Sequence, residues 1–191
     1  MSYVDFTLQS VKEKLDITHS REAFPLEVQT TTMPNPTRAI ILHDLVLATN
    51  INTEKARSEL IVMPMLKQVA QDTRTSLFSG NRFDVDPNRG LSGFIDFLIS
   101  KDPDQMIIEK PILILIEAKN QNIASGYGQC IAEMYAAQQQ NGHESIVYGC
   151  VTTGETWVFL ELQQNHVRID STSHYITDID DIYSIIIKIC E

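Results

Sequence analysis

Positive charge is scarce in this 191-residue sequence. It has 15 Lys and Arg residues against 25 Asp and Glu residues, which leaves a formal net charge of −10. Such a surface is unfavourable for coating a nucleic acid. The deficit is uneven, because residues 51–101 carry seven basic side chains against six acidic ones, whereas residues 141–191 carry two against eight. The acidity is therefore concentrated in the last third of the chain, although an ordinary solvated surface explains this distribution equally well.

Cysteines, long apolar runs and cofactor motifs are also few or absent. Cys130, Cys150 and Cys190 are widely spaced and fit neither a disulfide framework nor a zinc site, as is typical of apolar groups in a reducing compartment. The apolar run at 111–116 is too short to span a membrane. The first residues lack the basic start and apolar core of a signal peptide, and there is no Walker phosphate loop. We therefore expect a cytoplasmic protein without a membrane partner.

The composition is that of a globular protein. Hydrophobic residues make up 43% of the chain and charged residues 21%, and a chain of this length can bury a substantial core. We expect a single globular unit. Its α/β domain would span residues 53–191, and residues 1–52 would form a helical and irregular extension packed on that core.

Hydrophobic periodicity and turn residues predict mixed helices and strands. Helices are expected at residues 3–15, 53–72 with a kink at Pro64, 124–140, and from Thr177 or Asp178 to Ile189. Strands are expected near residues 75–85, 92–100, 111–119, 145–152, 156–162 and 166–169. Residues 37–48 fit a helix or a strand, with the helix favoured. The crossover from 111 to 152 requires a parallel strand pair. The predicted fold is α/β, a central mixed sheet flanked by helices.

An apolar strand ends on two charged residues, Glu117 and Lys119. The five residues 112–116 that precede them are branched aliphatics, which is typical of a fully buried central strand. Side chains alternate along a strand, so Glu117 and Lys119 point to one face and Ala118 to the other. Two charges at the end of a core strand are costly unless a ligand needs them. A metal ion with a reacting phosphate would meet that need, whereas the alternative is an ordinary ion pair.

A carboxylate also interrupts the preceding apolar strand, at Asp96. A polar loop containing Pro103 joins the two strands, which predicts a hairpin. Pairing would bring Asp96 close to Glu117, and two nearby carboxylates repel each other unless a cation lies between them. The alternative for Asp96 is that it accepts backbone hydrogen bonds in a bend.

Asp96, Glu117 and Lys119 together resemble the D…(D/E)-x-K signature of the PD-(D/E)xK, restriction-endonuclease-like superfamily. The segment 151–159, with the sequence VTTGETWVF, resembles a hairpin in the nuclease domain of type I restriction subunits. The resemblance covers roughly residues 53–162 and implies a restriction-endonuclease-like core. Ile95 replaces the usual proline. The Q-x-x-x-Y spacing of the exonuclease subfamily is absent, so that subfamily is not implied.

The resemblance implies a Mg²⁺ or Mn²⁺ site. Asp96 and Glu117 would each give a carboxylate oxygen, and the backbone carbonyl of Ala118 would give another. Glu59, on the predicted helix before the strands, resembles a helical glutamate of the family and would bind a second ion or its waters. The alternative for Glu59 is a solvated helix acid.

The resemblance also implies roles for two polar side chains beside the metal. Lys119 would orient the attacking water and offset charge on the reacting phosphate. Gln129 resembles a glutamine often found on the helix after the E-x-K strand, and it would hold Lys119 or a phosphate oxygen. The alternatives are a capping role for Gln129 and, for Trp157 in the later hairpin, core packing rather than base stacking.

The expected function is therefore metal-dependent hydrolysis of DNA phosphodiester bonds, with Asp96, Glu117, Lys119 and Gln129 as the catalytic residues. Because the chain is acidic, binding to DNA is expected to be weak without a homodimer or a partner protein. The alternative function is a catalytically inactive member of the same fold that binds protein or DNA.

Overall fold

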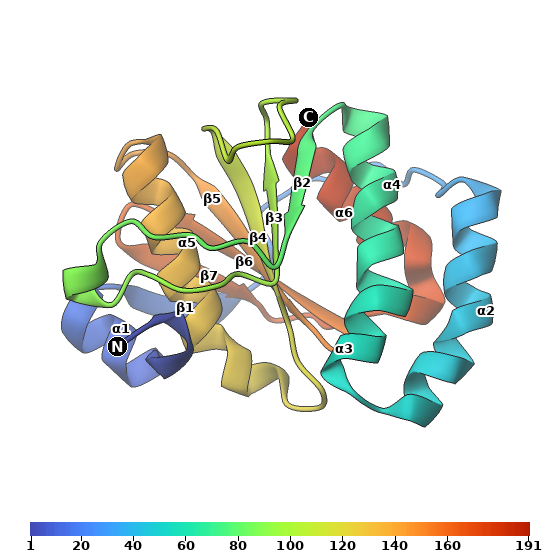
Figure 1. The fold of residues 1–191 in the computed structure, drawn as a ribbon, viewed down its shortest axis with the longest axis horizontal. Coiled ribbons are helices and arrows are strands. Elements are labelled where there is room, and N and C mark those ends of the chain that lie inside the picture. The colour runs from blue at the N-terminus through green and yellow to red at the C-terminus, as the bar shows by residue number, and fades with distance from the viewer.

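An eight-stranded mixed sheet runs through the molecule (Figure 1). The structure, a computed structural model, describes all of residues 1–191. Seven strands follow the spatial order β1-β7-β6-β5-β4-β3-β2, and β8 pairs with β6. The strands are β1 (Thr18–Glu22), β2 (Ser76–Ser79), β3 (Phe97–Ser100), β4 (Ile112–Ala118), β5 (Val147–Thr152), β6 (Thr156–Gln163), β7 (His166–Asp170) and β8 (His174–Tyr175).

Two strand pairs are parallel and the others are antiparallel. β4 runs parallel to β5, and β1 runs parallel to β7. The strands β2, β3 and β4 form an antiparallel meander, and β5, β6 and β7 form another. The parallel β4–β5 pair and the predicted α/β class are confirmed.

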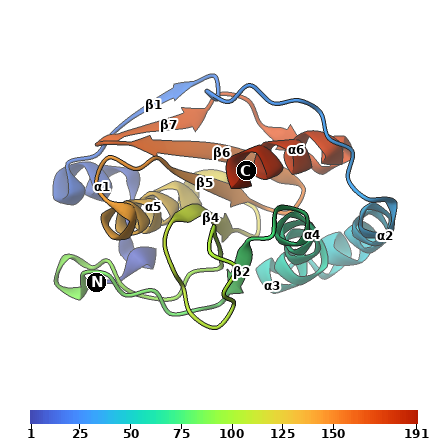
Figure 2. The ribbon, with the colours of Figure 1, turned by 90° about the horizontal axis from the view of Figure 1, so that it is seen from above.

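Helices cover both faces of the sheet (Figure 2). One face carries α1 (Leu8–Leu15) and α5 (Tyr127–Asn141), which is the crossover between β4 and β5. The other carries α2 (Asn35–Ile51), α3 (Glu54–Arg57), α4 (Met63–Thr73) and α6 (Ile179–Cys190). Short 3₁₀ helices occur at Tyr3–Asp5, Pro87–Arg89, Ile123–Gly126 and Ile176–Asp178. Residues 37–48 are helical, as favoured from the sequence.

The sheet separates two hydrophobic cores. Branched side chains of β4 alternate between them, with Leu115 in the core under α5 and Ile114 and Ile116 in the core under α4 and α6. The helix α5 is buried almost all round, from Gly128 to Gln138. Its short side chains, such as Ala132 and Ala136, allow this close packing. No helix in the molecule combines the length and apolarity that a membrane crossing requires.

The predicted kink at Pro64 takes the form of a π-helical turn, Ser58–Val62, between α3 and α4. Here the amide of Met63 donates to the carbonyl of Ser58. A π turn widens the backbone by one residue, which accommodates a proline that has no amide hydrogen and clashes with the preceding turn. Pro64 then lies in the first turn of α4, where its missing donor costs little.

Two strands are shorter than the sequence predicts. β2 ends at Ser79 and β3 begins at Phe97, and residues 80–96 form an irregular hairpin between them, held by isolated bridges. Gly80, Gly90 and Gly93 all have positive φ there, which breaks regular strand geometry. In addition, β1 was not predicted, because its sequence THSRE has no apolar alternation and its side chains are mostly exposed.

Residues 1–52 contribute to the same sheet and cores as the rest of the chain. β1 adds an edge strand, Tyr3 and Val11 are buried with α5, and Ile41 is buried with α4 and α6. The proposed boundary at residue 52 falls between α2 and α3, and it stays a prediction.

Candidate functional site

The three residues of the predicted signature meet where β4 ends and β3 begins. The register pairs Phe97 with Ile116, so Asp96, one residue earlier, lies next to Glu117. A carboxylate oxygen of Asp96 accepts a hydrogen bond from the amide of Ala118 at 2.8 Å. The backbone contact foreseen as the alternative for Asp96 is therefore present, and it holds the carboxylate at the end of β4.

Glu117, Lys119 and Gln129 form one hydrogen-bonded cluster. Lys119 Nζ is ion-paired with Glu117 Oε1 and donates to Gln129 Oε1 at 3.3 Å. Gln129 Nε2 donates to Glu117 Oε2 at 2.9 Å. The predicted contact between Gln129 and Lys119 is thus present. The amide of Gln129 does not cap α5, so the capping alternative is wrong.

Burial and neighbouring charge set the protonation of this cluster. Burial raises the pKa of Glu117, and the charge of Asp96 raises it further, to about 8 in total. Burial likewise raises the pKa of Asp96, against the hydrogen bond from Ala118. Desolvation alone would lower the pKa of Lys119, but the charge of Glu117 and its hydrogen bond outweigh this effect and raise the pKa. A divalent cation between the two acids would relieve their repulsion.

Two glycines at the start of α5 allow the cluster to form. A Cβ on Gly126 would lie 2.6 Å from Val151 Cγ1 and 3.3 Å from Lys119 Cε. A Cβ on Gly128 would lie 2.4 Å from the carbonyl oxygen of Phe6. The close approach of Lys119 and of the N-terminal segment explains the G-Y-G sequence, which is not a phosphate loop.

Sequence reasoning missed one acid near the cluster, Glu54. It is the first residue of α3 and follows the N-cap Thr53, whose hydroxyl accepts from the amide of Ala56. Partial desolvation raises the pKa of Glu54, Lys119 opposes this shift, and Asp96 adds to it. Glu54 is therefore close enough to interact electrostatically with Lys119 and Asp96. An acid in the first turn also suits the helix dipole, so Glu54 carries no distinct sequence signal for a site role.

Glu59 makes its ion pair outside the cluster, with a lysine of its own helical segment. Its carboxylate is ion-paired with Lys55 at 2.9 Å, four residues earlier, and its side chain is 62% exposed. This is the solvated arrangement foreseen as the alternative. Its role as a ligand for a second ion stays a prediction.

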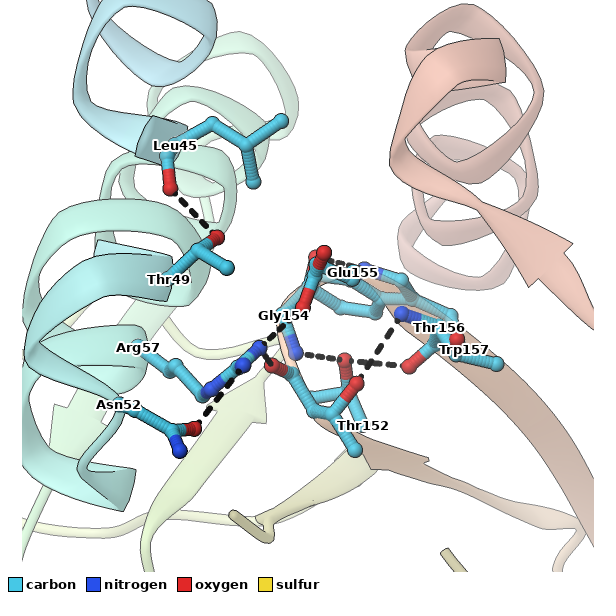
Figure 3. Close-up of polar contacts among 10 residues, drawn as sticks. Leu45, Thr49, Asn52, Arg57, Thr152, Gly154, Glu155, Thr156 and Trp157 are labelled. Carbon is cyan, nitrogen blue, oxygen red and sulfur yellow. Dashed lines mark hydrogen bonds and ion pairs between the residues drawn. The ribbon is translucent and has the colours of Figure 1, made fainter. Parts of the chain in front are cut away.

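A buried arginine fixes the start of α3 (Figure 3). Arg57 Nη1 donates to the carbonyl of Thr153 at 2.9 Å and to the carboxylate of Glu155 at 2.6 Å, and Nη2 donates to Asn52 Oδ1 at 3.3 Å. The turn between β5 and β6 is thereby tied to the helix that carries Glu54. Nothing in the sequence distinguished Arg57 from a surface basic residue.

The turn itself is closed by its own polar groups, as Figure 3 also shows. Gly154 has a φ of 81° and its amide donates to the hydroxyl of Thr152. Trp157 Nε1 donates to the carbonyl of Gly154 at 2.9 Å, and the indole is fully buried. The predicted hairpin is confirmed. The core-packing interpretation of Trp157 is also confirmed, since a buried ring is not free to stack on a base.

A surface groove of about 400 Å³ opens beside Asp96. It runs between the α3–α4 segment and the end of β2, and it is lined by Glu54, Lys55, Ser58, Glu59, Met63, Ser79, Gly80, Asp96 and Phe97. A second hollow of about 440 Å³, at the far end of α5 beside Gln140, contains none of the predicted site residues. Of the predicted site residues, Asp96 and Glu59 line the groove, whereas Glu117, Lys119 and Gln129 do not. Because it reaches Asp96, the groove is the candidate substrate site.

No three His, Cys, Asp or Glu side chains come together in a geometry that would hold a metal ion. The candidate centre offers two carboxylates, Asp96 and Glu117. Mg²⁺ accepts such a set, because it is commonly held by one or two carboxylates and keeps several waters. The predicted contribution of the Ala118 carbonyl stays a prediction.

Comparison of the chain with protein-family models, with curated proteins and with solved structures finds no match in any of the three. The resemblance to the nuclease superfamily therefore rests on the sequence motif alone and stays a prediction.

Proposed function

We propose that this chain is a Mg²⁺- or Mn²⁺-dependent nuclease-like domain that hydrolyses phosphodiester bonds in DNA. The observation that supports this most directly is the position of Lys119. Its ammonium group is held by Glu117 and Gln129 at the end of β4, with Asp96 on the adjoining strand. Two acids and an amine around one point are the groups that metal-assisted phosphoryl chemistry requires.

The order of elements agrees with the restriction-endonuclease-like core that the resemblance implies. A helix, α4, precedes the β2–β3–β4 meander, and the crossover helix α5 leads to β5, parallel to β4. Asp96, Glu117 and Gln129 come from the meander and the crossover helix. We propose that this part of the α/β sheet is such a core.

The donor set fits a divalent cation. Asp96 and Glu117 would hold it, and each carboxylate carries a raised pKa that an adjacent cation would lower. The cation would polarise the scissile phosphate and acidify a bound water. The chain would supply the rest: Lys119 orients the water and offsets developing negative charge, and Gln129 fixes Lys119. Glu54 adds a third acid at the edge of the groove.

Plasmid cleavage tests the proposal. Supercoiled plasmid is incubated with Mg²⁺ or Mn²⁺ and with the wild type, Asp96→Ala or Lys119→Ala. We expect each substitution to reduce the cleavage rate at least 100-fold, on the order expected for loss of a key electrostatic group. Glu13→Gln, which changes an exposed acid on α1, serves as the matched control and should cleave at the wild-type rate. Equal activity in Asp96→Ala and the wild type would exclude the proposed site.

A second candidate function has an observation of its own. Both carboxylate oxygens of Glu117 already have partners within the chain, Lys119 and Gln129, so the cluster is satisfied without a cation. A catalytically inactive module that binds protein or DNA would retain such a cluster for stability. A divalent-metal titration separates the two functions: an active site raises the melting temperature with Mn²⁺ and loses this effect in Asp96→Ala, whereas an inactive module ignores the ion.

We also propose that DNA is bound weakly by the isolated chain. The net charge of −10 opposes approach to a polyanion. A homodimer or a partner protein would compensate. Helix α2 has apolar side chains available for such a contact, since Ile40, Val46 and Leu47 are each at least half exposed.

A further inference from the structure

A fully buried acid, Glu133, lies directly behind the cluster. It follows Gln129 by one turn of α5, so the two side chains share a face. Glu133 Oε1 accepts from Gln129 Nε2 at 3.1 Å, while Oε2 is buried without any partner. The residue has no exposed surface. Its only side-chain hydrogen bond is the one with the amide of Gln129, which connects it to the site.

The amide of Gln129 works in one orientation only. Its oxygen faces the ammonium of Lys119, and its nitrogen faces the carboxyl groups of Glu117 and Glu133. A half-turn about the last side-chain bond would set the NH₂ against the ammonium and the oxygen against both acids. The contacts of Gln129 with Glu117 and with Glu133 are both buried, and the one with Glu133 involves no proposed metal ligand.

We propose that Glu133 is a positioning residue, whose hydrogen bond fixes the amide of Gln129 and thereby the placement of Lys119 and Glu117. The inference rests on the proposed function, because it takes Lys119 and Glu117 to act in phosphodiester hydrolysis. Its own evidence is the buried contact, which exists without metal or substrate.

A purely structural reason for Glu133 is poorly supported. Its helical neighbours Ala132, Met134 and Ala137 are buried and apolar, so a hydrophobic side chain would fill the position at lower cost. Burial raises the pKa of Glu133 well above its usual range, and the charge of Glu117 raises it further. Asp96 acts in the same direction, and Lys119 opposes it. Burial therefore favours the neutral form of the acid, and a glutamine would reproduce its shape and its acceptor oxygen.

The test compares Glu133→Gln, which keeps an acceptor, with Glu133→Met, which removes it. The metal-free full-length chain is studied by NMR, and the hydrogen exchange of the Gln129 side-chain amide is measured. We expect the exchange of this amide to be about tenfold faster in Glu133→Met, because one buried hydrogen bond is lost. In Glu133→Gln the exchange should stay near the wild-type rate. Gln138→Met removes a partly buried hydrogen bond further along α5, to the carbonyl of Ser145, and should leave Gln129 unchanged.

A second readout is the dissociation constant for Mn²⁺ by calorimetry. Residues behind metal ligands typically change affinity about 10-fold to 100-fold, so Glu133→Met should weaken binding by at least tenfold and Glu133→Gln should restore it. Unchanged amide exchange in Glu133→Met would overturn the inference. A wild type that neither binds Mn²⁺ nor cleaves plasmid would overturn the proposed function instead, while the exchange data would still decide the role of Glu133. If Glu133→Met does not fold, Glu133→Leu takes its place.

Discussion

Buried acids dominate the candidate site at the scale of single residues. Glu117 and Glu133 are each no more than 1% exposed, and both carry raised pKa values because burial disfavours their charged forms. An ionised carboxylate in such a place costs several kcal/mol unless it is compensated. Lys119 and Gln129 compensate Glu117, whereas burial of Glu133 favours its neutral form. Because burial changes the pKa of these acids on folding, the free energy of unfolding depends on pH.

The free energy of unfolding should fall as pH rises, in part because of Glu133. The raised pKa lets the folded chain keep this proton at pH values where the unfolded chain has already lost it, so each pH unit in that range lowers stability by at most about 1.4 kcal/mol. Glu133→Gln cannot titrate and should flatten the slope by that amount. Urea denaturation at pH 5.5, 6.5 and 7.5 measures it.

The matched control for this experiment is Glu13→Gln, which changes an exposed acid and should preserve the wild-type slope. Identical slopes in Glu133→Gln and the wild type would show that Glu133 is ionised in the folded protein.

The positions of single site residues were predictable from the sequence where they follow from the alternation of side chains along a strand. Alternation along an apolar strand was enough to place Glu117 and Lys119 on one face, and hairpin pairing was enough to bring Asp96 beside them. Glu133 was not predictable, because an acid four residues after a glutamine on a helix is usually solvent exposed. Its burial depends on packing against the N-terminal segment, where Tyr3 is also fully buried.

At the scale of elements, one polar contact ties the helix that carries Glu54 to a turn of the sheet. Arg57 is 6% exposed and ties α3 to the β5–β6 turn through the carbonyl of Thr153 and the carboxylate of Glu155. The helix start that it holds carries Glu54 at the edge of the groove. A helix of four residues followed by a π turn has little stability of its own, so tertiary contacts must hold it.

Arg57→Leu should lower the free energy of unfolding by about 2–3 kcal/mol. The substitution leaves the carbonyl of Thr153 without this donor and removes a charge-assisted hydrogen bond. The control is Arg82→Leu, because Arg82 is an exposed arginine paired with Asp84, and such pairs contribute at most about 1 kcal/mol. Urea denaturation of both variants gives the comparison. A loss in Arg57→Leu no larger than in Arg82→Leu would contradict this role for Arg57.

Element prediction from the sequence worked where hydrophobic runs were long. The strands at β4, β5 and β6 and the helix α5 follow from such runs. The hairpin at 80–96 was overestimated as strand, because Gly80 and Gly93 interrupt a segment that otherwise alternates. The edge strand β1 was missed, because pairing with β7 stabilises a polar sequence with no strand pattern of its own.

At the scale of the whole molecule, each of the two hydrophobic cores contains buried cysteine thiols. Cys130, Cys150 and Cys190 are fully buried, and burial raises the pKa of each, that of Cys190 to about 12. A thiol reacts as the thiolate. Burial keeps reagents from reaching these cysteines, and their raised pKa keeps them in the unreactive thiol form. The sequence indicated buried cysteines, and the structure confirms this.

Thiol labelling should therefore report global unfolding. With an aromatic disulfide reagent at pH 8, we expect no labelling of the native protein over minutes and three labels per chain in denaturant. Gln9→Cys, on the exposed side of α1, should add one rapidly reacting thiol and confirm that the reagent is active. Fast labelling of the native wild type would show that a core opens locally.

The sole tryptophan also has an optical consequence. Trp157 is fully buried, and its indole nitrogen is bonded to Gly154 in the turn that Arg57 holds. Its emission maximum should be blue-shifted in the native state and move to longer wavelength on denaturation. Because the indole lies in the core under α4 and α6 and is bonded to this turn, a change in quantum yield on adding ions or oligonucleotides would signal a rearrangement of the turn without any attached dye.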